Sequence, residues 1–200
     1  MSDGTTTLAI QSALDRLRLT PNDSAARKEL ISQSYGRLAA VARRLLGPAY
    51  RERPEDTSGL LAEAYLRLES ALGAVRPESV RQYLGLAALQ MRRALIDLIR
   101  KERGRDGERE TPIALDAGTD GGVNVPAPPG VDADWRLELM DAVGRLDESE
   151  REAVDLLFFH GLTQLEAAGV LGIDESTVKR RWARARVRLA RWLQEFGPEP

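Results

Sequence analysis

The sequence predicts an all-α protein made of two helical domains joined by a flexible acidic linker. Apolar residues recur at helical spacing through most of the chain, and no alternating strand pattern bounded by turn residues occurs. Residues 111–134 break this pattern with four Gly, four Pro, four Asp and no Lys or Arg. Such a composition cannot pack a core or hold a helix. We therefore expect a first domain over residues 1–105, a linker over 106–134, and a second domain over 135–200 that ends in a helix–turn–helix.

Four helices are expected in the first domain. A short first helix ends at Thr20-Pro21, and a second spans about 24–46, where Gly47-Pro48 stops it. A third covers roughly 58–71. A fourth begins near Pro77, because proline suits a first helical turn, and runs to about Arg103. Its buried stripe is predicted to comprise Val80, Leu84, Ala87, Met91, Ala94 and Leu98.

The second domain is expected to begin with helices over about 135–145 and 148–160. Asp147 and Glu150 have the spacing of a capping box for the second of these. A further helix follows Thr163, whose hydroxyl can cap it, and runs to Leu171. Gly172 then supplies a left-handed turn, and Asp174 caps the last helix. This order of signals is typical of a helix–turn–helix.

The last helix is apolar on one side and basic elsewhere. Its apolar stripe is Val178, Trp182, Ala185, Leu189 and Trp192. Between Ser176 and Leu193 there are seven basic residues and no acidic one. A basic helix face is often only solvated, but the capped helix after a glycine turn favours a recognition helix in a DNA major groove. Ser176, Arg180 and Ala183 lie opposite the stripe in the first two turns, with Lys179 and Arg184 on the flanks, and these five are expected to lie near base edges. Arg181 lies nearer the stripe and is expected to be structural or phosphate-bound.

A second basic cluster lies at the end of the fourth helix. Residues 92–109 hold seven basic side chains against four acids, a net charge of +3. A solvated face with local ion pairs and a nucleic-acid contact explain this cluster equally well. Two basic helices in two tethered domains favour the contact, because linked weak sites gain avidity on one DNA molecule. Tyr83 is a further candidate for base stacking, but its mostly apolar face places it in the core.

Composition excludes several kinds of site. The chain has no cysteine and one histidine, His160, so thiol chemistry, disulfides and a histidine cluster are excluded. Glu63, Glu69 and Asp97 are spaced like ordinary helix-surface carboxylates, so we expect no enzyme activity, metal or cofactor. No apolar run reaches membrane-spanning length and the start lacks a signal-peptide pattern, so we expect no membrane insertion and a cytoplasmic protein.

Three stretches resemble the extracytoplasmic-function (ECF) sigma factors of the sigma-70 superfamily. LDESEREAVDLLFFHGLTQLEAAGVLGIDESTVKRRWARARVRL is similar to that family's second conserved domain. SGLLAEAYLRL and RQYLGLAALQMRRALIDLIRKERGR are similar to its first. The resemblance implies a promoter-specificity subunit that binds core RNA polymerase and promoter DNA. It also implies control by an anti-sigma factor as one form of regulation.

The resemblance assigns roles to three sets of residues. Core polymerase would bind the third helix, around Leu60, Leu61, Glu63, Tyr65 and Leu68. The fourth helix would capture the minus-ten element through Gln90, Arg92, Arg93, Arg100 and Lys101. The last helix would read the minus-thirty-five element through Ser176, Thr177, Lys179, Arg180, Ala183 and Arg184. The chain departs from the family pattern at Gly59 and Ala62 in the third helix and at Ala167 in the helix–turn–helix.

Two other classes of protein compete with this reading. A stand-alone LuxR-like regulator would share the helix–turn–helix, but its N-terminal half should hold a receiver or ligand pocket with strands, and residues 1–105 show no strand pattern. An enzyme acting on nucleic acid needs a nucleophile or clustered carboxylates for a metal, and the carboxylates of the first domain are not clustered.

Overall fold

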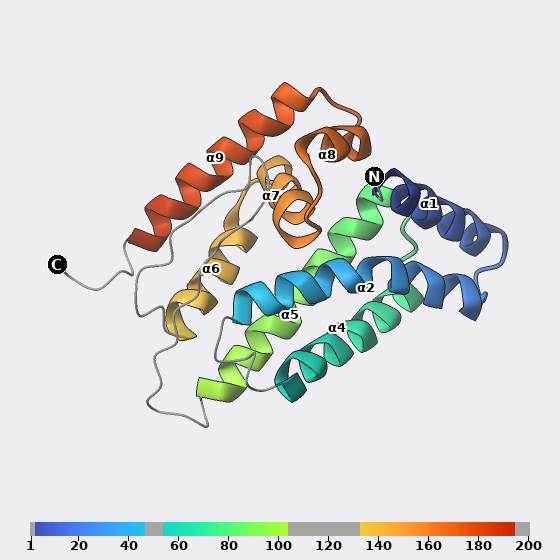
Figure 1. Ribbon diagram of the computed structural model, residues 1–200, viewed down its shortest axis with the longest axis horizontal. Coiled ribbons are helices and arrows are strands. Elements are labelled where there is room, and N and C mark those ends of the chain that lie inside the picture. The colour runs from blue at the N-terminus through green and yellow to red at the C-terminus, as the bar shows by residue number, and fades with distance from the viewer. Residues whose placement is uncertain (1–2, 47–53, 104–132, 195–200) are drawn as a thin grey trace.

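Helix α5 (Val80–Arg103) lies at the centre of the molecule and contacts elements of both halves of the chain (Figure 1). The computed structural model describes residues 3–46, 54–103 and 133–194, and every regular element in these ranges is helical. The expected all-α class is confirmed at this level. Most of the expected linker, residues 104–132, lies outside the described residues, and the last two residues assigned to it already belong to a helix.

The first half consists of α1 (Asp3–Leu19), α2 (Ser24–Leu46), α4 (Pro54–Ala74) and α5. The turn between α1 and α2 is fixed by Asp23, whose carboxylate accepts a hydrogen bond of 2.9 Å from the Ala26 amide. Arg16 of α1 reaches over this turn to Asp23 and Glu29, with N–O distances of 3.2 and 2.6 Å. The predicted range of α2 is confirmed at both ends.

Two helix starts differ from the expectation. Helix α4 begins at Pro54, four residues before the expected start, because proline suits the first turn of a helix. Helix α5 begins at Val80 rather than near Pro77. The hydroxyl of Ser79 accepts from the Gln82 amide at 3.2 Å, so Ser79 caps α5 and sets its first residue.

The second half consists of α6 (Ala133–Arg145), α7 (Glu148–Val154), the π-helical turn η1 (Asp155–Phe159), α8 (Gln164–Leu171) and α9 (Glu175–Gln194). The single helix expected over 148–160 therefore changes from α to π geometry at Asp155. The turn closes with a bond of 3.0 Å from the His160 amide to the Asp155 carbonyl, five residues apart. Gly161 follows with φ +63° and redirects the chain toward α8.

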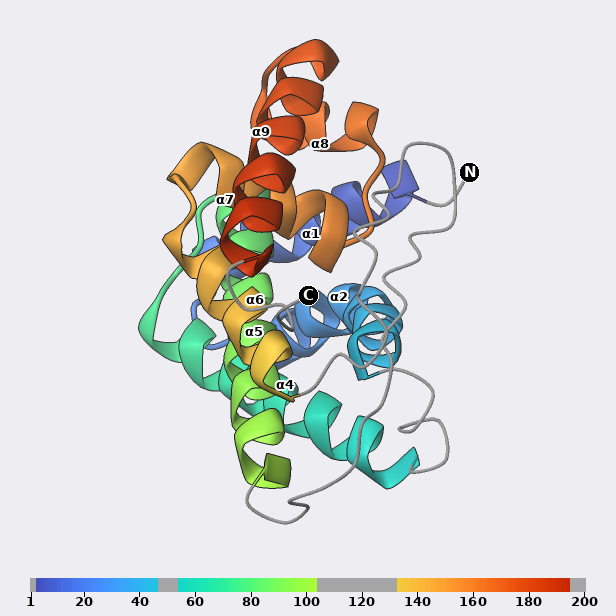
Figure 2. The same ribbon diagram turned by 90° about the vertical axis from the view of Figure 1, so that its left-hand side faces the viewer.

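Both apolar clusters of the molecule are built from the two halves together. One joins Leu61, Ala88 and Met91 to Trp135 and Phe159, and the other joins Tyr83 and Leu84 to Leu171 and Val178. Figures 1 and 2 show α6 to α9 lying along one side of α5, with α1, α2 and α4 on the other. The two halves thus share core residues in this arrangement, which the sequence did not predict.

Tyr83 lies in the core, as expected. Its ring is fully buried, its hydroxyl donates to the Leu30 carbonyl at 2.7 Å, and it accepts from the Ser34 hydroxyl at 2.9 Å. Burial raises the pKa of the Tyr83 hydroxyl well above its ordinary value, so the side chain stays neutral. Tyr83 therefore ties α5 to α2 and is withdrawn from any contact with bases. None of the described helices is long and apolar enough to cross a bilayer.

Candidate nucleic-acid interface

The helix–turn–helix is set by local capping on both sides of its turn. Thr163 accepts from the Glu166 amide at 3.3 Å, and the Glu166 carboxylate accepts from the Thr163 amide at 2.8 Å. The predicted Thr163 cap is confirmed, as is the left-handed Gly172, which has φ +66°. Asp174 precedes α9, and its carbonyl accepts from the Thr177 amide at 2.9 Å. These contacts hold the first residue of α9 in a defined place.

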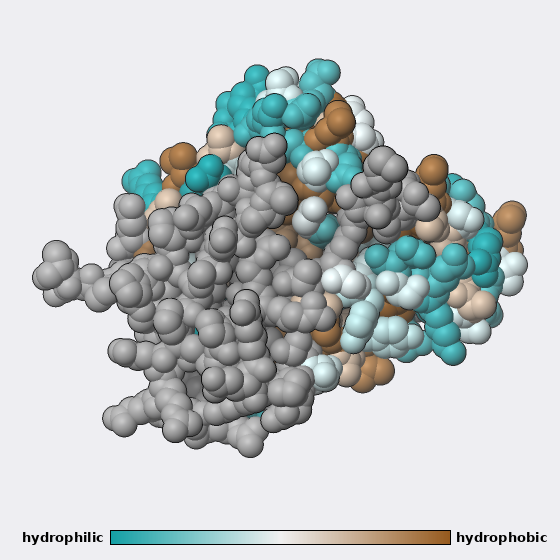
Figure 3. Space-filling model, viewed as in Figure 1, coloured by the Kyte–Doolittle hydropathy of each residue, from teal (hydrophilic) through white to brown (hydrophobic). Residues whose placement is uncertain are grey.

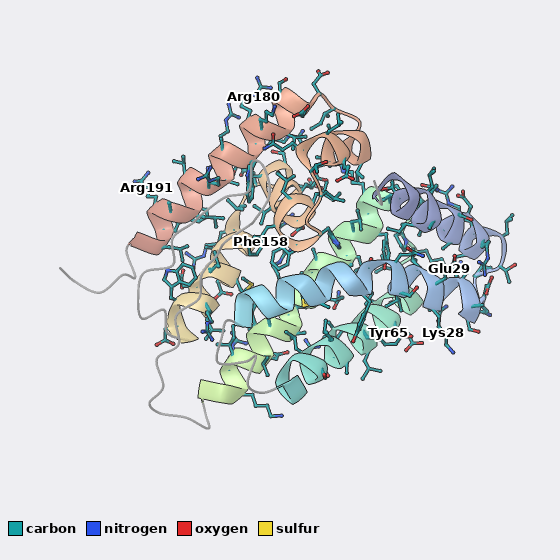
Figure 4. The ribbon with its side chains drawn as sticks, viewed as in Figure 1. Lys28, Glu29, Tyr65, Phe158, Arg180 and Arg191 are labelled. Carbon is teal, nitrogen blue, oxygen red and sulfur yellow. The ribbon has the colours of Figure 1, made fainter. Side chains whose placement is uncertain are left out.

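Helix α9 packs through the predicted apolar stripe. Val178, Ala185 and Leu189 are buried, and Trp182 and Trp192 are partly buried against the same clusters. The burial of one side of α9 leaves its opposite side to solvent. Figure 4 shows Arg180 and Arg191 along this outer side, and in Figure 3 the surface over the start of α9 is mostly hydrophilic.

The residues expected to read bases lie on the exposed side of α9. Ser176, Lys179, Arg180, Ala183 and Arg184 are all exposed in the first two to three turns. Thr177 is half-buried, and its hydroxyl accepts from Arg180 at 3.1 Å. Lys179 pairs with Glu175 at 2.8 Å one turn earlier. This side thus places two arginines and a lysine around small residues, a surface that fits phosphates and base edges in a major groove.

Two other arginines of α9 form ion pairs with carboxylates at the start of α7 or within it. Arg188 pairs with Asp147 at 2.7 Å and with the buried carboxylate of Glu150 at 3.0 Å. The predicted Asp147–Glu150 capping box is wrong, since Asp147 makes no side-chain cap and both carboxylates face Arg188 instead. Arg181 lies 3.6 Å from Glu152, in keeping with the structural role expected for it. Arg181 and Arg188 thus join α9 to α7, although the side chain of Arg188 is still 46% exposed.

The residues expected to bind the minus-ten element are divided by burial. Arg93, Arg100 and Lys101 are exposed along α5. Gln90 and Arg92 are only 5% and 6% exposed, and for Arg92 the second half supplies the cover. The guanidinium of Arg92 hydrogen-bonds the Asp155 carboxylate, and its central carbon lies 5.4 Å from the centre of the Phe159 ring.

The Arg92–Asp155 pair is desolvated. Burial raises the pKa of Asp155 to about 6, and the charge of Arg92 offsets only part of this effect. Burial likewise lowers the pKa of Arg92. Sequence reasoning missed this pair, although an aspartate inside the apolar run AVDLLFF was a signal that its carboxylate faces a buried partner.

The residues expected to bind polymerase are also divided. Leu60, Leu61 and Leu68 are buried in the two apolar clusters, so they shape α4 rather than present a surface. Glu63 is exposed and pairs with Arg67 at 2.6 Å, while Tyr65 is half-buried and packs against one of the apolar clusters (Figure 4). Leu66 is a large apolar residue of this helix that is 59% exposed.

Sequence reasoning missed Leu66, although it lies three residues after Glu63 and four after Ala62 on the same helix face. Gly59 and Ala62, where the chain departs from the family pattern, are exposed on α4 as well. Among the described residues, no group of three or more His, Cys, Asp or Glu side chains is arranged to hold a metal ion.

Comparison with known proteins gives one family. A sequence model described as "ECF sigma factor" matches residues 15–195. The chain is 29% identical over 150 residues to proteins named ECF RNA polymerase sigma factor SigK from Mycobacterium sp. strain KMS and from strain JLS. In each case the match covers 75% of this chain and 72% of the relative.

Two solved structures are also similar. CnrH in complex with the cytosolic domain of CnrY matches 94% of this chain and 99% of its own, with 20% identity and a TM-score of 0.41. The sigma factor RpoE in complex with the anti-sigma factor NepR from Bartonella quintana matches 84% and 96%, with 22% identity and a TM-score of 0.38.

Proposed function

The chain belongs to the ECF sigma factor family, and we propose that it divides promoter recognition between its two halves at the residues described above. It is an RNA polymerase sigma factor, so it binds core RNA polymerase and directs promoter recognition and initiation. The family is one of initiation factors rather than enzymes. Because polymerase and promoter DNA are its partners, we place it in the cytoplasm.

The second half reads the minus-thirty-five element through α9. The observation that carries this assignment is the division of α9 into a buried apolar side and an exposed side with Lys179, Arg180 and Arg184. Only the first turns of a recognition helix reach base edges, and in α9 these turns carry three exposed cations beside small residues. Arginine at such a position discriminates bases through two hydrogen bonds to guanine.

The first half takes the minus-ten element on α5. Arg93, Arg100 and Lys101 are accessible there and supply the phosphate contacts that draw a strand to this helix. Trapping unstacked bases costs a few kcal/mol per step, which planar and cationic groups beside the strand offset. Arg92 joins this site only when the second half moves off α5.

Core polymerase docks on the exposed side of α4. Glu63 and Leu66 lie there, Tyr65 is half-buried at the edge of the core, and the buried leucines hold the helix in place. A charged group beside one exposed leucine, with an aromatic ring at the edge, fits the apolar centre and polar rim of a protein interface. An anti-sigma factor regulates the protein by binding it. Co-purification of such a protein with this chain from the native cell tests this partner.

The test is transcription by the full chain with core polymerase from the same organism. We expect a stable complex with core and initiation from a cognate promoter. A chain that ignores core but binds duplex DNA tightly as a dimer is instead the LuxR-like regulator. The all-helical first half argues against that alternative, since residues 3–46 and 54–103 form no strand.

A further inference from the structure

Helix α5 meets the second half along one side through three polar contacts. Arg81 pairs with Glu152 of α7 at 2.5 Å. The Leu84 carbonyl lies 2.8 Å from Nε2 of His160. Arg92 pairs with Asp155 of η1. The three contacts span about three turns of α5, and each one ends on the short segment from α7 to His160.

The contact at Arg92 is the most enclosed of the three. The side chains of Arg92 and Asp155 are each 7% exposed, whereas that of Arg81 is 46% exposed. A buried ion pair contributes little net stability, since desolvation offsets the attraction, but it fixes which groups meet. Shared apolar packing around Met91 and Phe159 therefore holds the halves together, and the ion pair sets their register.

We propose that this closed arrangement is a self-inhibited state in which Asp155 occupies the place of a DNA phosphate on Arg92. The second half and the minus-ten strand then compete for one side of α5. The inference rests on the proposed function, because it takes Arg92 as part of the minus-ten site. Carboxylate and phosphate oxygens accept hydrogen bonds from the same N–H groups of a guanidinium. Asp155 and a DNA phosphate therefore cannot both bind Arg92 at once.

The surrounding surface fits a state that opens. Arg93, Arg100 and Lys101 stay exposed on α5, so a strand can make its first contacts before the halves separate. A cleft of about 710 Å³ runs along the seam and is lined by Arg81, Arg92, Glu152 and Asp155 among others. Solvent therefore reaches the edge of the buried pair.

The first test measures the distance between the halves in solution. The chain has no cysteine, so spin labels can be placed by Ser70→Cys on α4 and Leu165→Cys on α8, both exposed positions. The parent should give one narrow distance. Asp155→Arg places two cations together and should give longer, broader distances. Asp147→Arg is the matched control, since it makes the same charge change at a pair within the second half.

A charge swap guards against simple misfolding. Arg92→Asp combined with Asp155→Arg restores opposite charges and should restore the narrow distance. Failure of the swap to do so, when Asp155→Arg has already broadened the distance, would show general disruption and overturn the proposal. An unchanged narrow distance in Asp155→Arg would overturn it as well.

The second test measures DNA binding by the same full-length variants. The probe is a fluorescein-labelled single strand that carries the non-template minus-ten sequence of a promoter transcribed by the wild-type holoenzyme. Asp155→Arg should bind it roughly tenfold more tightly than Asp147→Arg at equal salt, because the binding-competent fraction rises. Equal affinities would overturn self-inhibition while leaving wild-type transcription intact. Loss of wild-type core binding would instead refute the proposed function.

Discussion

Arg188 of α9 lies 2.7 Å from the carboxylate of Asp147, at the first turn of α7. The same guanidinium lies 3.0 Å from Glu150, whose side chain is almost fully buried. One arginine thus fastens the distal part of the recognition helix to the start of α7. It neutralises a buried carboxylate, so its role lies in stability rather than in base reading.

Arg188→Ala should lower the free energy of unfolding by more than Arg191→Ala does, because it leaves the buried carboxylate of Glu150 without its ion-pair partner. Urea unfolding followed by circular dichroism measures this loss. Arg191→Ala, at an exposed position on the same helix, should change the unfolding free energy by less than about 0.5 kcal/mol. Equal decreases in unfolding free energy in the two variants would contradict a structural role for Arg188.

Arg180→Ala and Arg184→Ala should each weaken binding to the minus-thirty-five element by about 1–3 kcal/mol and relax base preference. Holoenzyme binding to promoter fragments with single base substitutions, at several salt concentrations, measures both effects. Arg191→Ala should weaken binding uniformly and lower the salt slope, as a phosphate contact does. If base preference depended on Arg191 but not on Arg180 or Arg184, the side of α9 assigned to base reading would be wrong.

Ionisation of Asp155 should make stability depend on pH. Its pKa is about 6 in the fold and ordinarily 3.8, mainly because it is buried, with Arg92, Arg151 and Glu152 as its charged neighbours. The folded chain holds this proton more tightly than the unfolded chain. The contribution is therefore fully present below about pH 3.8 and is lost as the pH rises through about 6.

Asp155→Asn removes that dependence. The unfolding free energy of the wild type relative to Asp155→Asn should fall by on the order of 1–3 kcal/mol between about pH 4 and pH 7. Unfolding curves measured across this range report the difference directly. Asp147→Asn, at an exposed carboxylate, should follow the wild type. Parallel pH profiles for the wild type and Asp155→Asn would contradict the assigned pKa.

Leu66 and Leu68 should separate binding from folding on the same helix. Leu66→Asp changes an exposed side chain and should weaken core polymerase binding at least tenfold, about 1.4 kcal/mol, with an unchanged unfolding curve. Leu68→Ala empties a buried position and should lower the unfolding free energy by about 2–5 kcal/mol. Titration of the labelled chain with core enzyme gives the affinities. If Leu66→Asp bound core polymerase with wild-type affinity, the docking surface would not lie on this side of α4.

Local signals in the sequence predicted the helices well. The ends of α2, the Thr163 cap and the Gly172 turn each depend on residues within one turn of chain, and all are confirmed. The stripe of α9 was also readable, since a period of 3.6 residues separates a buried side from an exposed one. On this helix the candidate site could therefore be predicted down to its exposed residues.

Contacts distant in sequence account for the failures. The Asp147–Glu150 box obeys a local rule, but Arg188 lies 41 residues after Asp147 and takes both carboxylates. Arg92 was expected to contact DNA, but its side chain is buried against Asp155, 63 residues later in the sequence. No periodicity encodes such pairings.

The closed arrangement depends on the number of residues in the π-helical turn η1. In an α-helix, residues five apart point about 140° away from each other. The five-residue closure from His160 to Asp155 brings both onto the side facing α5, where one meets Arg92 and the other the Leu84 carbonyl. Deleting one residue here would restore α geometry and swing one of the two away. A chain one residue shorter at this turn would thus lose one of these two polar contacts between the halves even if every side chain were kept, so its length matters here as much as its composition.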